Sequence, residues 1–147
     1  IGSELMMSFT VMGDAVNLAS RLEAVNKIYG TRILISQATA IAVGAALETR
    51  EIDRLRVVGQ TVPQSVFEVM GKPGELTKQQ DRLREHYSQG LAAYRSCRWE
   101  DARSCFNAAL AIVPEDGPSL TLLHRIDHFQ GNPPAAGWDG SWQMEHK

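Results

Sequence analysis

The chain contains few cysteines, no long apolar run and no excess of charge of either sign. Its two cysteines, Cys97 and Cys105, lie eight positions apart, with neither the spacing of zinc ligands nor the density of a secreted disulfide scaffold. We expect both to be reduced residues of a core. The longest apolar stretches hold about six residues, whereas a membrane-spanning helix needs about 20. The sequence therefore predicts neither a disulfide-stabilised domain nor a membrane span.

Charge and composition exclude some classes of partner. Fifteen Lys and Arg residues against seventeen Asp and Glu give a net charge of -2, so no basic field draws the chain to nucleic acid or to a membrane surface. Hydrophobic residues make up 44% and charged residues 22%, as in an ordinary globular protein. The sequence begins at Ile1 without a signal segment, so we expect a cytoplasmic piece of a longer protein.

Composition changes at residues 71–74, Gly-Lys-Pro-Gly, where an apolar stretch gives way to a charged one. Glycine and proline together are the strongest local signals of a break between elements. We therefore predict a first unit over residues 1–72, a helical extension over residues 75–130 and an irregular tail over residues 131–147.

The first unit alternates strand and helix signals, which predicts an α+β fold. Asp14 and Ser36 stand where the N-caps of two helices belong, and Pro63 lies in the turn of an antiparallel hairpin. The expected elements are a strand over residues 8–13, a helix over 15–27, a strand over 31–36, a short helix over 37–44, and strands over 49–59 and 65–71.

The extension has no strand signals and predicts helices over residues 83–96, 99–112 and 119–129. Its small, aromatic and proline positions are spaced as in a tetratricopeptide repeat: Gly90, Ala102, Phe106, Ala109 and Pro114. One repeat cannot bury its own face. We therefore expect the third helix to act as its cap through Leu120, Leu122, Leu123 and Ile126. A peptide-binding repeat and a plain hairpin packed on the first unit both remain open.

Several polar residues have an ordinary structural explanation. Glu51 and Asp53 are expected to be solvated residues of a strand. His124 and His128 have helical spacing, but no carboxylate motif accompanies them, so we predict no zinc site. In the tail, two tryptophans are expected to hold an otherwise irregular segment.

The residues with the clearest chemistry lie on the helix predicted over residues 15–27. Asn17 and Arg21 are four positions apart, so they share one face. A separate apolar face is formed by Ala15, Leu18, Leu22 and Val25. An amide and a permanently charged guanidinium suit ribose and phosphate oxygens. From spacing alone, a merely solvated helix face is the commoner interpretation of such a pair.

The segment "TVMGDAVNLASRLE", followed by "REIDRLRVVG" and "VFEVMG", resembles the C-terminal part of a class III nucleotidyl cyclase catalytic domain. The resemblance covers residues 1–71. It implies a ferredoxin-like sheet-and-helix domain that dimerises head to tail. It also implies conversion of a nucleoside triphosphate to its 3',5'-cyclic monophosphate and pyrophosphate at the dimer interface.

The resemblance places the ribose-orienting asparagine of the family on Asn17 and its transition-state arginine on Arg21. Thr10 falls on a position that reads the base, where a hydroxyl suits adenine better than guanine, so ATP is the expected substrate. Many relatives carry a lysine at Val58 to hold the triphosphate, which valine cannot do. Arg56, two residues away on the same strand face, is the candidate to reach those phosphates, or else a surface arginine.

The aspartates that bind Mg²⁺ or Mn²⁺ in this family lie upstream of any residue in this sequence. We therefore expect the chain alone to be inactive and the longer protein to be a bacterial-type adenylate cyclase, cytoplasmic or on the cytoplasmic side of a membrane-anchored parent. The alternative is a degenerate cyclase fold that dimerises while its helical extension recruits a protein partner.

Overall fold

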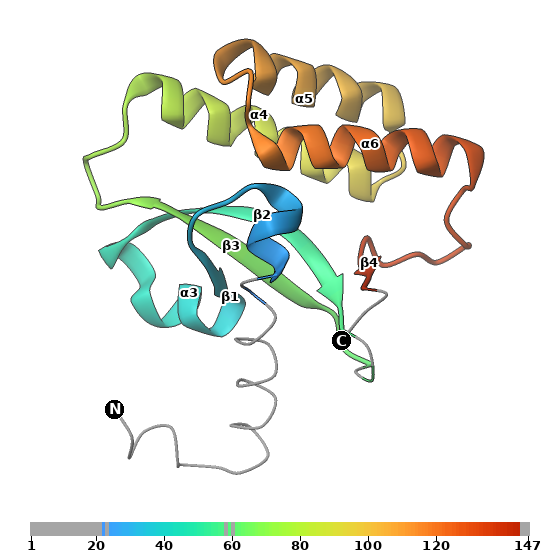
Figure 1. Cartoon of the computed structure of the whole chain (residues 1–147), viewed down its shortest axis with the longest axis horizontal. Coiled ribbons are helices and arrows are strands. Elements are labelled where there is room, and N and C mark those ends of the chain that lie inside the picture. Colours follow the sequence, from blue (N-terminus) through green and yellow to red (C-terminus); the bar gives the residue numbers. More distant parts are fainter. Residues whose placement is uncertain (1–21, 23, 58, 60, 145–147) are drawn as a thin grey trace.

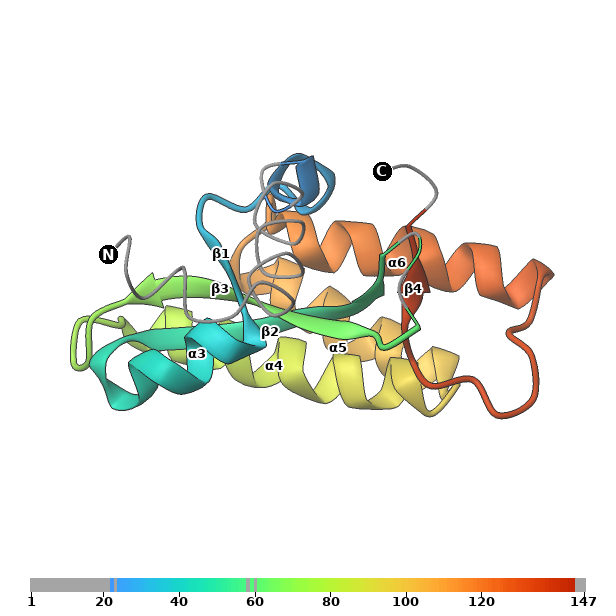
Figure 2. The ribbon, with the colours of Figure 1, turned by 90° about the horizontal axis from the view of Figure 1, so that it is seen from below.

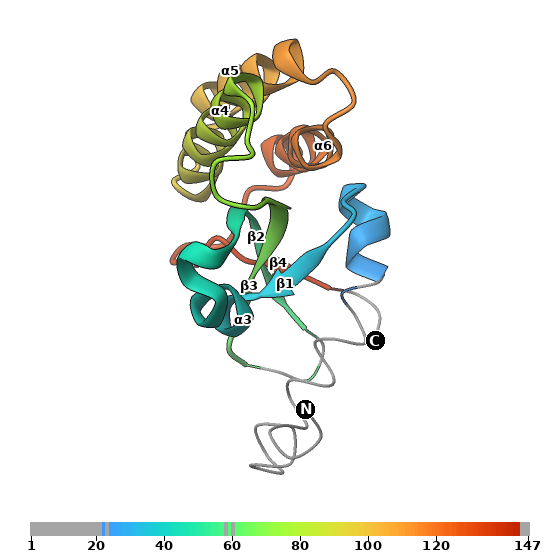
Figure 3. The same ribbon diagram turned by 90° about the vertical axis from the view of Figure 1, so that its left-hand side faces the viewer.

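The computed structural model describes residue 22, residues 24–57, residue 59 and residues 61–144. A four-stranded sheet forms one layer, and three helices lie together on one of its sides (Figures 1 and 3). The short helix α3 (Gln37–Val43) lies away from that helical layer. The described part is thus a mixed α+β fold, as the alternation of strand and helix signals predicted.

The sheet has the strand order β1-β3-β2-β4. Its strands are β1 (Leu34–Ser36), β2 (Glu48–Arg56), β3 (Gln64–Gly71) and β4 (Trp142–Gln143). β2 and β3 pair antiparallel, which confirms the predicted hairpin. β1 also pairs antiparallel with β3, whereas β4 runs parallel to β2.

A bulge in β2 changes which of its side chains are buried. Glu51 lies opposite Phe67 and Asp53 lies opposite Val66, so Ile52 is an extra residue on the β2 side. A bulge of this kind interrupts the alternation of side chains between the two faces. Ile52 and Asp53 are therefore both fully buried, although they are neighbours in the chain.

Local capping explains where two elements begin and end. Ser36 accepts a hydrogen bond from the backbone N–H of Thr39, which confirms its predicted role as N-cap of α3. Leu22 and residues 24–29 are helical, and the helix ends at Gly30, whose φ of 67° suits glycine. The earlier part of the predicted 15–27 helix and the predicted strand over 8–13 lie outside the described residues.

The extension consists of α4 (Lys78–Arg95), α5 (Trp99–Ile112) and α6 (Gly117–Gly131). α4 begins five residues earlier than predicted because Thr77 forms a capping box with Gln80. α6 begins at the segment expected to break the chain, because the proline there occupies the first turn of the helix, where no backbone N–H is needed.

Small residues let α4 and α5 approach closely. A Cβ atom built on Gly90 would lie 2.7 Å from Cε1 of Phe106, so the aromatic ring fills the space that the missing side chain leaves. Phe106, Ala102 and Ala109 are fully buried, and Trp99 packs partly buried against the same core.

The sheet and the helices share one hydrophobic core. Figure 2 shows the helices running along the sheet, and the buried cluster draws on strands and helices alike. Its larger members are Val25, Tyr29, Leu34, Ile52, Leu55, Val66, Tyr87, Leu91, Tyr94, Phe106, Leu122, Ile126 and Phe129. The connection at residues 71–74 therefore joins two sequence segments that pack on each other.

The C-terminal tail returns to the sheet through its aromatic residues. Trp138 packs edge-on against Tyr94 with 5.4 Å between ring centroids, and Trp142 packs edge-on against Phe129 at 5.7 Å. Residues 142–143 also form β4, so the tail is not irregular throughout. The strand was missed because two residues are too few to show an alternating pattern.

Both cysteines are free, but only one of them is partly buried. Cys105 is half-buried, whereas Cys97 is exposed, so the expectation that both lie in a core is wrong for Cys97. Its φ of 58° is left-handed, and its N–H donates to the carbonyl of Tyr94. Cys97 thus ends α4 in the turn to α5.

Among the described residues, no helix combines the length and the hydropathy that a membrane crossing requires.

The shared core predicts the effect of Phe106→Ala. Removing a fully buried ring from a packed core costs about 3 to 5 kcal/mol, and sheet and helices should still unfold in one transition. Urea unfolding followed by circular dichroism and by tryptophan fluorescence measures both quantities. Leu120 is 43% exposed, so the expectation that it helps to cap the repeat is wrong; Leu120→Ala is therefore the control and should change stability far less. Separate transitions for sheet and helices would contradict the shared core.

Candidate functional site

Among the residues predicted to act on a nucleotide, Arg56 lies in the described part of the chain. The others lie outside the described residues: Thr10, Asn17, Arg21, and with them Asp14 and Val58. The described part does include the C-terminal end of the helix that is predicted to carry Asn17 and Arg21. The structure therefore shows how that end is held.

Arg56 ends β2 and contacts the C-terminal tail. Its Nη2 lies 2.6 Å from Oδ2 of Asp139, and its Nη1 donates to the carbonyl of Thr61. Hydrogen bonds from Ser141, together with the charge of Arg56, lower the pKa of Asp139 below its ordinary value. The Arg56 side chain remains 31% exposed, and an ion pair this exposed contributes at most about 1 kcal/mol.

A buried carboxylate, Asp53, lies between the sheet and two helices. The hydroxyl of Tyr29 donates to Oδ2 of Asp53 at 2.6 Å, and Nη1 of Arg125 donates to the same oxygen. The backbone N–H of Arg54 donates to Oδ1 at 2.7 Å, and Nη2 of Arg125 donates to the Tyr29 hydroxyl at 2.9 Å. Asp53 is 0% exposed, so the expectation that it is a solvated strand residue is wrong.

A second buried ion pair also joins β2 to α6, but here the cation lies on β2 and the carboxylate lies at the start of α6. Nη1 and Nη2 of Arg50 donate to the two carboxylate oxygens of Asp116 at 3.1 and 3.0 Å. Nη2 also donates to Oε1 of Glu68 at 2.6 Å. Asp116 is the N-cap of α6 and accepts from the N–H of Ser119. Glu51, the other carboxylate expected to be solvated, is partly exposed and pairs with Arg95 of α4 at 3.0 Å.

The two pairs therefore cross: β2 supplies Arg50 and Asp53, and α6 supplies Asp116 and Arg125. Burial raises the pKa of Tyr29 well above its ordinary value, and the charge of Asp53 raises it further. Burial alone would lower the pKa of Arg125, but its interactions with Asp53, Tyr29 and Tyr94 together outweigh burial, and the pKa rises. Tyr29 therefore remains a protonated donor and Arg125 a cation at neutral pH.

The first turn of α6 also touches the end of the helix formed by residues 24–29. A Cβ atom built on Gly117 would lie 2.0 Å from the carbonyl oxygen of Tyr29 and 3.0 Å from Cα of Gly30. The hydroxyl of Thr121 lies 2.9 Å from the carbonyl oxygen of Gly117 and 3.2 Å from that of Ile28, and it donates its one proton between these two acceptors. The negative end of one helix thus meets the positive end of another, an electrostatically favourable arrangement.

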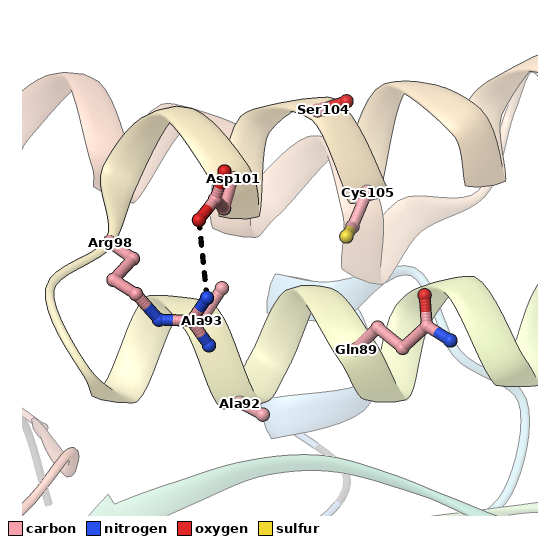
Figure 4. A pocket seen from close by; sticks show the side chains of 7 residues that line it. All are labelled: Gln89, Ala92, Ala93, Arg98, Asp101, Ser104 and Cys105. Carbon is pink, nitrogen blue, oxygen red and sulfur yellow. Dashed lines mark hydrogen bonds and ion pairs between the residues drawn. The ribbon is translucent and has the colours of Figure 1, made fainter.

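A shallow groove between α4 and α5 is lined by the side chains in Figure 4. Arg98 and Asp101 form an exposed ion pair of 3.1 Å on one side of it. Burial raises the pKa of the Cys105 thiol, so this cysteine stays protonated rather than becoming a thiolate nucleophile. The groove thus presents no activated group.

The described residues do not form a metal centre. No group of three or more His, Cys, Asp or Glu side chains gathers among them, and His124 and His128 lie exposed on α6. We therefore assign no metal ligand within the described part of the chain.

Comparison with known proteins identifies relatives of one kind. The chain is 34% identical over 129 residues to the terminal-differentiation specific adenylate cyclase of Dictyostelium discoideum, covering 85% of this chain and 6% of that protein. It is 35% identical over 71 residues to adenylate cyclase 1 of Rhizobium meliloti, covering 48% of this chain and 11% of the relative. It is 36% identical over 72 residues to the adenylate cyclase of Anabaena cylindrica, covering 47% and 14%.

The chain contains a cyclase-related region. It spans only 6% to 14% of the length of these curated relatives. The similarity to the Dictyostelium cyclase leaves out only 15% of the chain, so it extends from the sheet into the helical extension. No family model and no solved structure matches the chain.

Sequence reasoning missed the buried charges of β2, although one signal of them was present. The apolar residues Ile52, Leu55 and Val57 are spaced three and then two apart. A regular strand would keep a spacing of two, so the interval of three indicates the bulge that buries Asp53. The partners Asp116 and Arg125 lie more than 60 residues away, and no local pattern connects them.

The crossed pairs predict a strong coupling between Asp53 and Arg125. Removing either charge leaves the other buried without a partner, at a cost of about 3 to 5 kcal/mol. The double variant Asp53→Leu/Arg125→Met should therefore be more stable than the sum of the single effects by about 1 to 3 kcal/mol. Chemical denaturation of all four proteins measures this coupling.

The exposed pair of Arg98 and Asp101 supplies the matched control. The variants Arg98→Met and Asp101→Leu should couple by less than about 0.5 kcal/mol, because both side chains are largely in water. Equal coupling energies in the two cycles would contradict the importance given to burial.

The raised pKa of Tyr29 predicts a pH dependence of stability. The unfolded phenol ionises near the ordinary value of 10.0, whereas the folded phenol retains its proton. The unfolded state then binds fewer protons, so the free energy of unfolding falls as pH rises above 10. Tyr29→Phe should lose less stability than the wild type between about pH 9 and 11 in urea titrations. If the free energy of unfolding falls equally with pH in both proteins, the pKa of Tyr29 is not raised in the folded state.

Proposed function

We propose that this chain is the C-terminal part of the catalytic domain of a class III adenylate cyclase, which converts ATP to 3',5'-cyclic AMP and pyrophosphate. The observation that carries the proposal is the similarity of 34% to 36% to three proteins named adenylate cyclases. The α+β arrangement of the described residues is compatible with it. The motif around Asn17 and Arg21 supplies the proposed chemistry.

In the proposed reaction the 3'-hydroxyl of ATP attacks the α-phosphorus and pyrophosphate leaves. Asn17 orients the ribose through its amide, and Arg21 stabilises the negative charge that develops on the phosphate oxygens. Arginine suits this role because its guanidinium keeps its charge when water is excluded. Thr10 reads the adenine base.

Arg56 is proposed to bind the triphosphate. Its pairing with Asp139 is partly exposed, so the ion pair is weak. A triphosphate carries more charge than one carboxylate and accepts two parallel hydrogen bonds from a guanidinium. Phosphate oxygens can therefore replace Asp139 at Arg56.

Mg²⁺ or Mn²⁺ would be held by aspartates that precede this sequence in the longer protein. We propose that this longer protein is cytoplasmic and forms a homodimer through its cyclase domain. A bound metal ion would neutralise phosphate charge during the reaction. Because the family resemblance places these aspartates upstream of the sequence, the chain alone is proposed to be inactive.

The helical extension is proposed to support the cyclase region rather than to act as a separate binding module. Its helices bury their apolar faces against the sheet in one core, and α6 pairs with charges inside β2. A partner protein of the extension would have to bind the outer surface of α4 and α5. No contact with nucleic acid or membrane is proposed.

A protein extended at its N-terminus to include the metal aspartates tests the proposal. With Mg²⁺ or Mn²⁺ it should form cyclic AMP from ATP faster than cyclic GMP from GTP. Arg21→Ala and Asn17→Ala should each lower kcat by about 10²-fold or more with little change in stability, as expected for groups that act in the transition state. Product formation is measured by chromatography and stability by thermal unfolding.

Arg82→Ala is the control for loss of an arginine. Arg82 lies exposed on α4, so this variant should keep the wild-type kcat. An extended protein that produces no cyclic nucleotide, or variants of Arg21 and Asn17 with normal turnover, would overturn the proposal.

A further inference from the structure

The end of the helix formed by residues 24–29 is held by α6 through three separate contacts. Gly117 packs its backbone against the carbonyl of Tyr29. Thr121 lies within hydrogen-bond distance of the carbonyl of Ile28. Arg125 donates to the hydroxyl of Tyr29, which itself donates to Asp53. The contacts follow one face of α6 at intervals of four residues, as its helical repeat requires.

These contacts fix the helix both along and around its axis. The backbone contact at Gly117 sets how close the helix end can come to α6. The side chain of Tyr29 is 1% exposed and points its hydroxyl to both Asp53 and Arg125, so rotation of the helix would break two buried hydrogen bonds. Asp53 belongs to β2, so Tyr29 fixes the helix end against the sheet and against α6 at the same time.

The chain leads directly from this anchored end to the proposed catalytic residues. Leu22, the first described helical residue, follows Arg21, and Asn17 lies four positions earlier. A helix transmits a displacement of one end along its axis because its hydrogen-bonded turns are stiff. Since the helix predicted over residues 15–27 includes Arg21, the position of Tyr29 is expected to bear on the position of Arg21.

We propose that α6 positions the helix predicted to carry Asn17 and Arg21: Gly117 and Arg125 are positioning residues that, by anchoring Tyr29, hold these two groups where the substrate requires them. This inference rests on the proposed cyclase function. It assigns to the helical extension a direct part in turnover, through the helix that the sequence predicts for both groups.

The size of the expected effect follows from the geometry at Gly117. Real Cβ atoms essentially never approach another atom within 3.0 Å, and an added Cβ would lie 2.0 Å from the Tyr29 oxygen. Gly117→Ala must therefore move α6 and the helix end apart by about 1 Å, and a misplacement of 1 Å can cost about 10²-fold in rate.

Gly131→Ala is the matched control, because Gly131 lies at the other end of α6 and a Cβ there meets nothing within 4 Å. In the N-terminally extended protein, Gly117→Ala should lower kcat by about 10²-fold while KM for ATP stays within about twofold. Gly131→Ala should leave both constants unchanged. Initial rates at varied ATP concentration give both constants.

A second pair of variants covers the case in which Gly117→Ala does not fold. Tyr29→Phe and Tyr87→Phe each remove one fully buried hydroxyl, and the Tyr87 hydroxyl donates only to the carbonyl of Ile52 at 2.7 Å. Tyr29→Phe should lose more stability than Tyr87→Phe, because its hydroxyl bonds to two charged groups, while both variants should remain folded at assay temperature; only Tyr29→Phe should lower kcat, by about tenfold. Amide hydrogen exchange at residues 24–29 should accelerate in Tyr29→Phe alone.

The possible results separate this inference from the function on which it rests. A selective loss of kcat in Gly117→Ala or Tyr29→Phe supports positioning by α6. Equal kcat values in Tyr29→Phe and Tyr87→Phe overturn it while leaving the cyclase proposal intact. A wild-type extended protein without cyclase activity overturns the proposed function and the positioning role with it.

Discussion

Two buried ion pairs of opposite polarity between β2 and α6 constrain the rest of the structure. A charge removed from water is tolerated only when a partner and further hydrogen bonds compensate it, and here each guanidinium faces a carboxylate on the other element. The separation of Arg50 and Asp53 along β2 must therefore suit the separation of Asp116 and Arg125 along α6. Only one placement of the helix along the strand satisfies both pairs, so the pairs specify how the extension docks.

Other features follow from that placement. The bulge at Ile52 brings Asp53 to the helical side of the sheet, and glycine at position 117 allows α6 to approach the neighbouring helix closely enough for Arg125 to reach Asp53 and Tyr29. The tail completes the enclosure, since the ring of Trp142 lies 4.2 Å from the guanidinium carbon of Arg125. Residues from four parts of the chain thus surround one buried carboxylate.

Local patterns were sufficient to predict most elements and insufficient to predict how they meet. The hairpin, the Ser36 cap and α5 were predicted well because β-branched runs, capping residues and helical periodicity act over a few residues. The burial of Asp53 was not predicted, because a carboxylate in a strand looks solvated until its distant partner is known. Of the predicted nucleotide site, the described residues include Arg56 and the anchored end of the helix, while the roles of Asn17 and Arg21 depend on the family resemblance.

The crossed charges also determine where this polypeptide can be recombined with others. A chimera joined at residues 71–74 looks natural from the sequence, yet it would present Arg50 and Asp53 of β2 to a foreign surface that lacks Asp116 and Arg125. Grafting a new C-terminal module therefore requires either a junction beyond the tail that ends in β4, or simultaneous replacement of both β2 charges by apolar residues. In this protein the extension and the strand beneath it are a single unit of exchange.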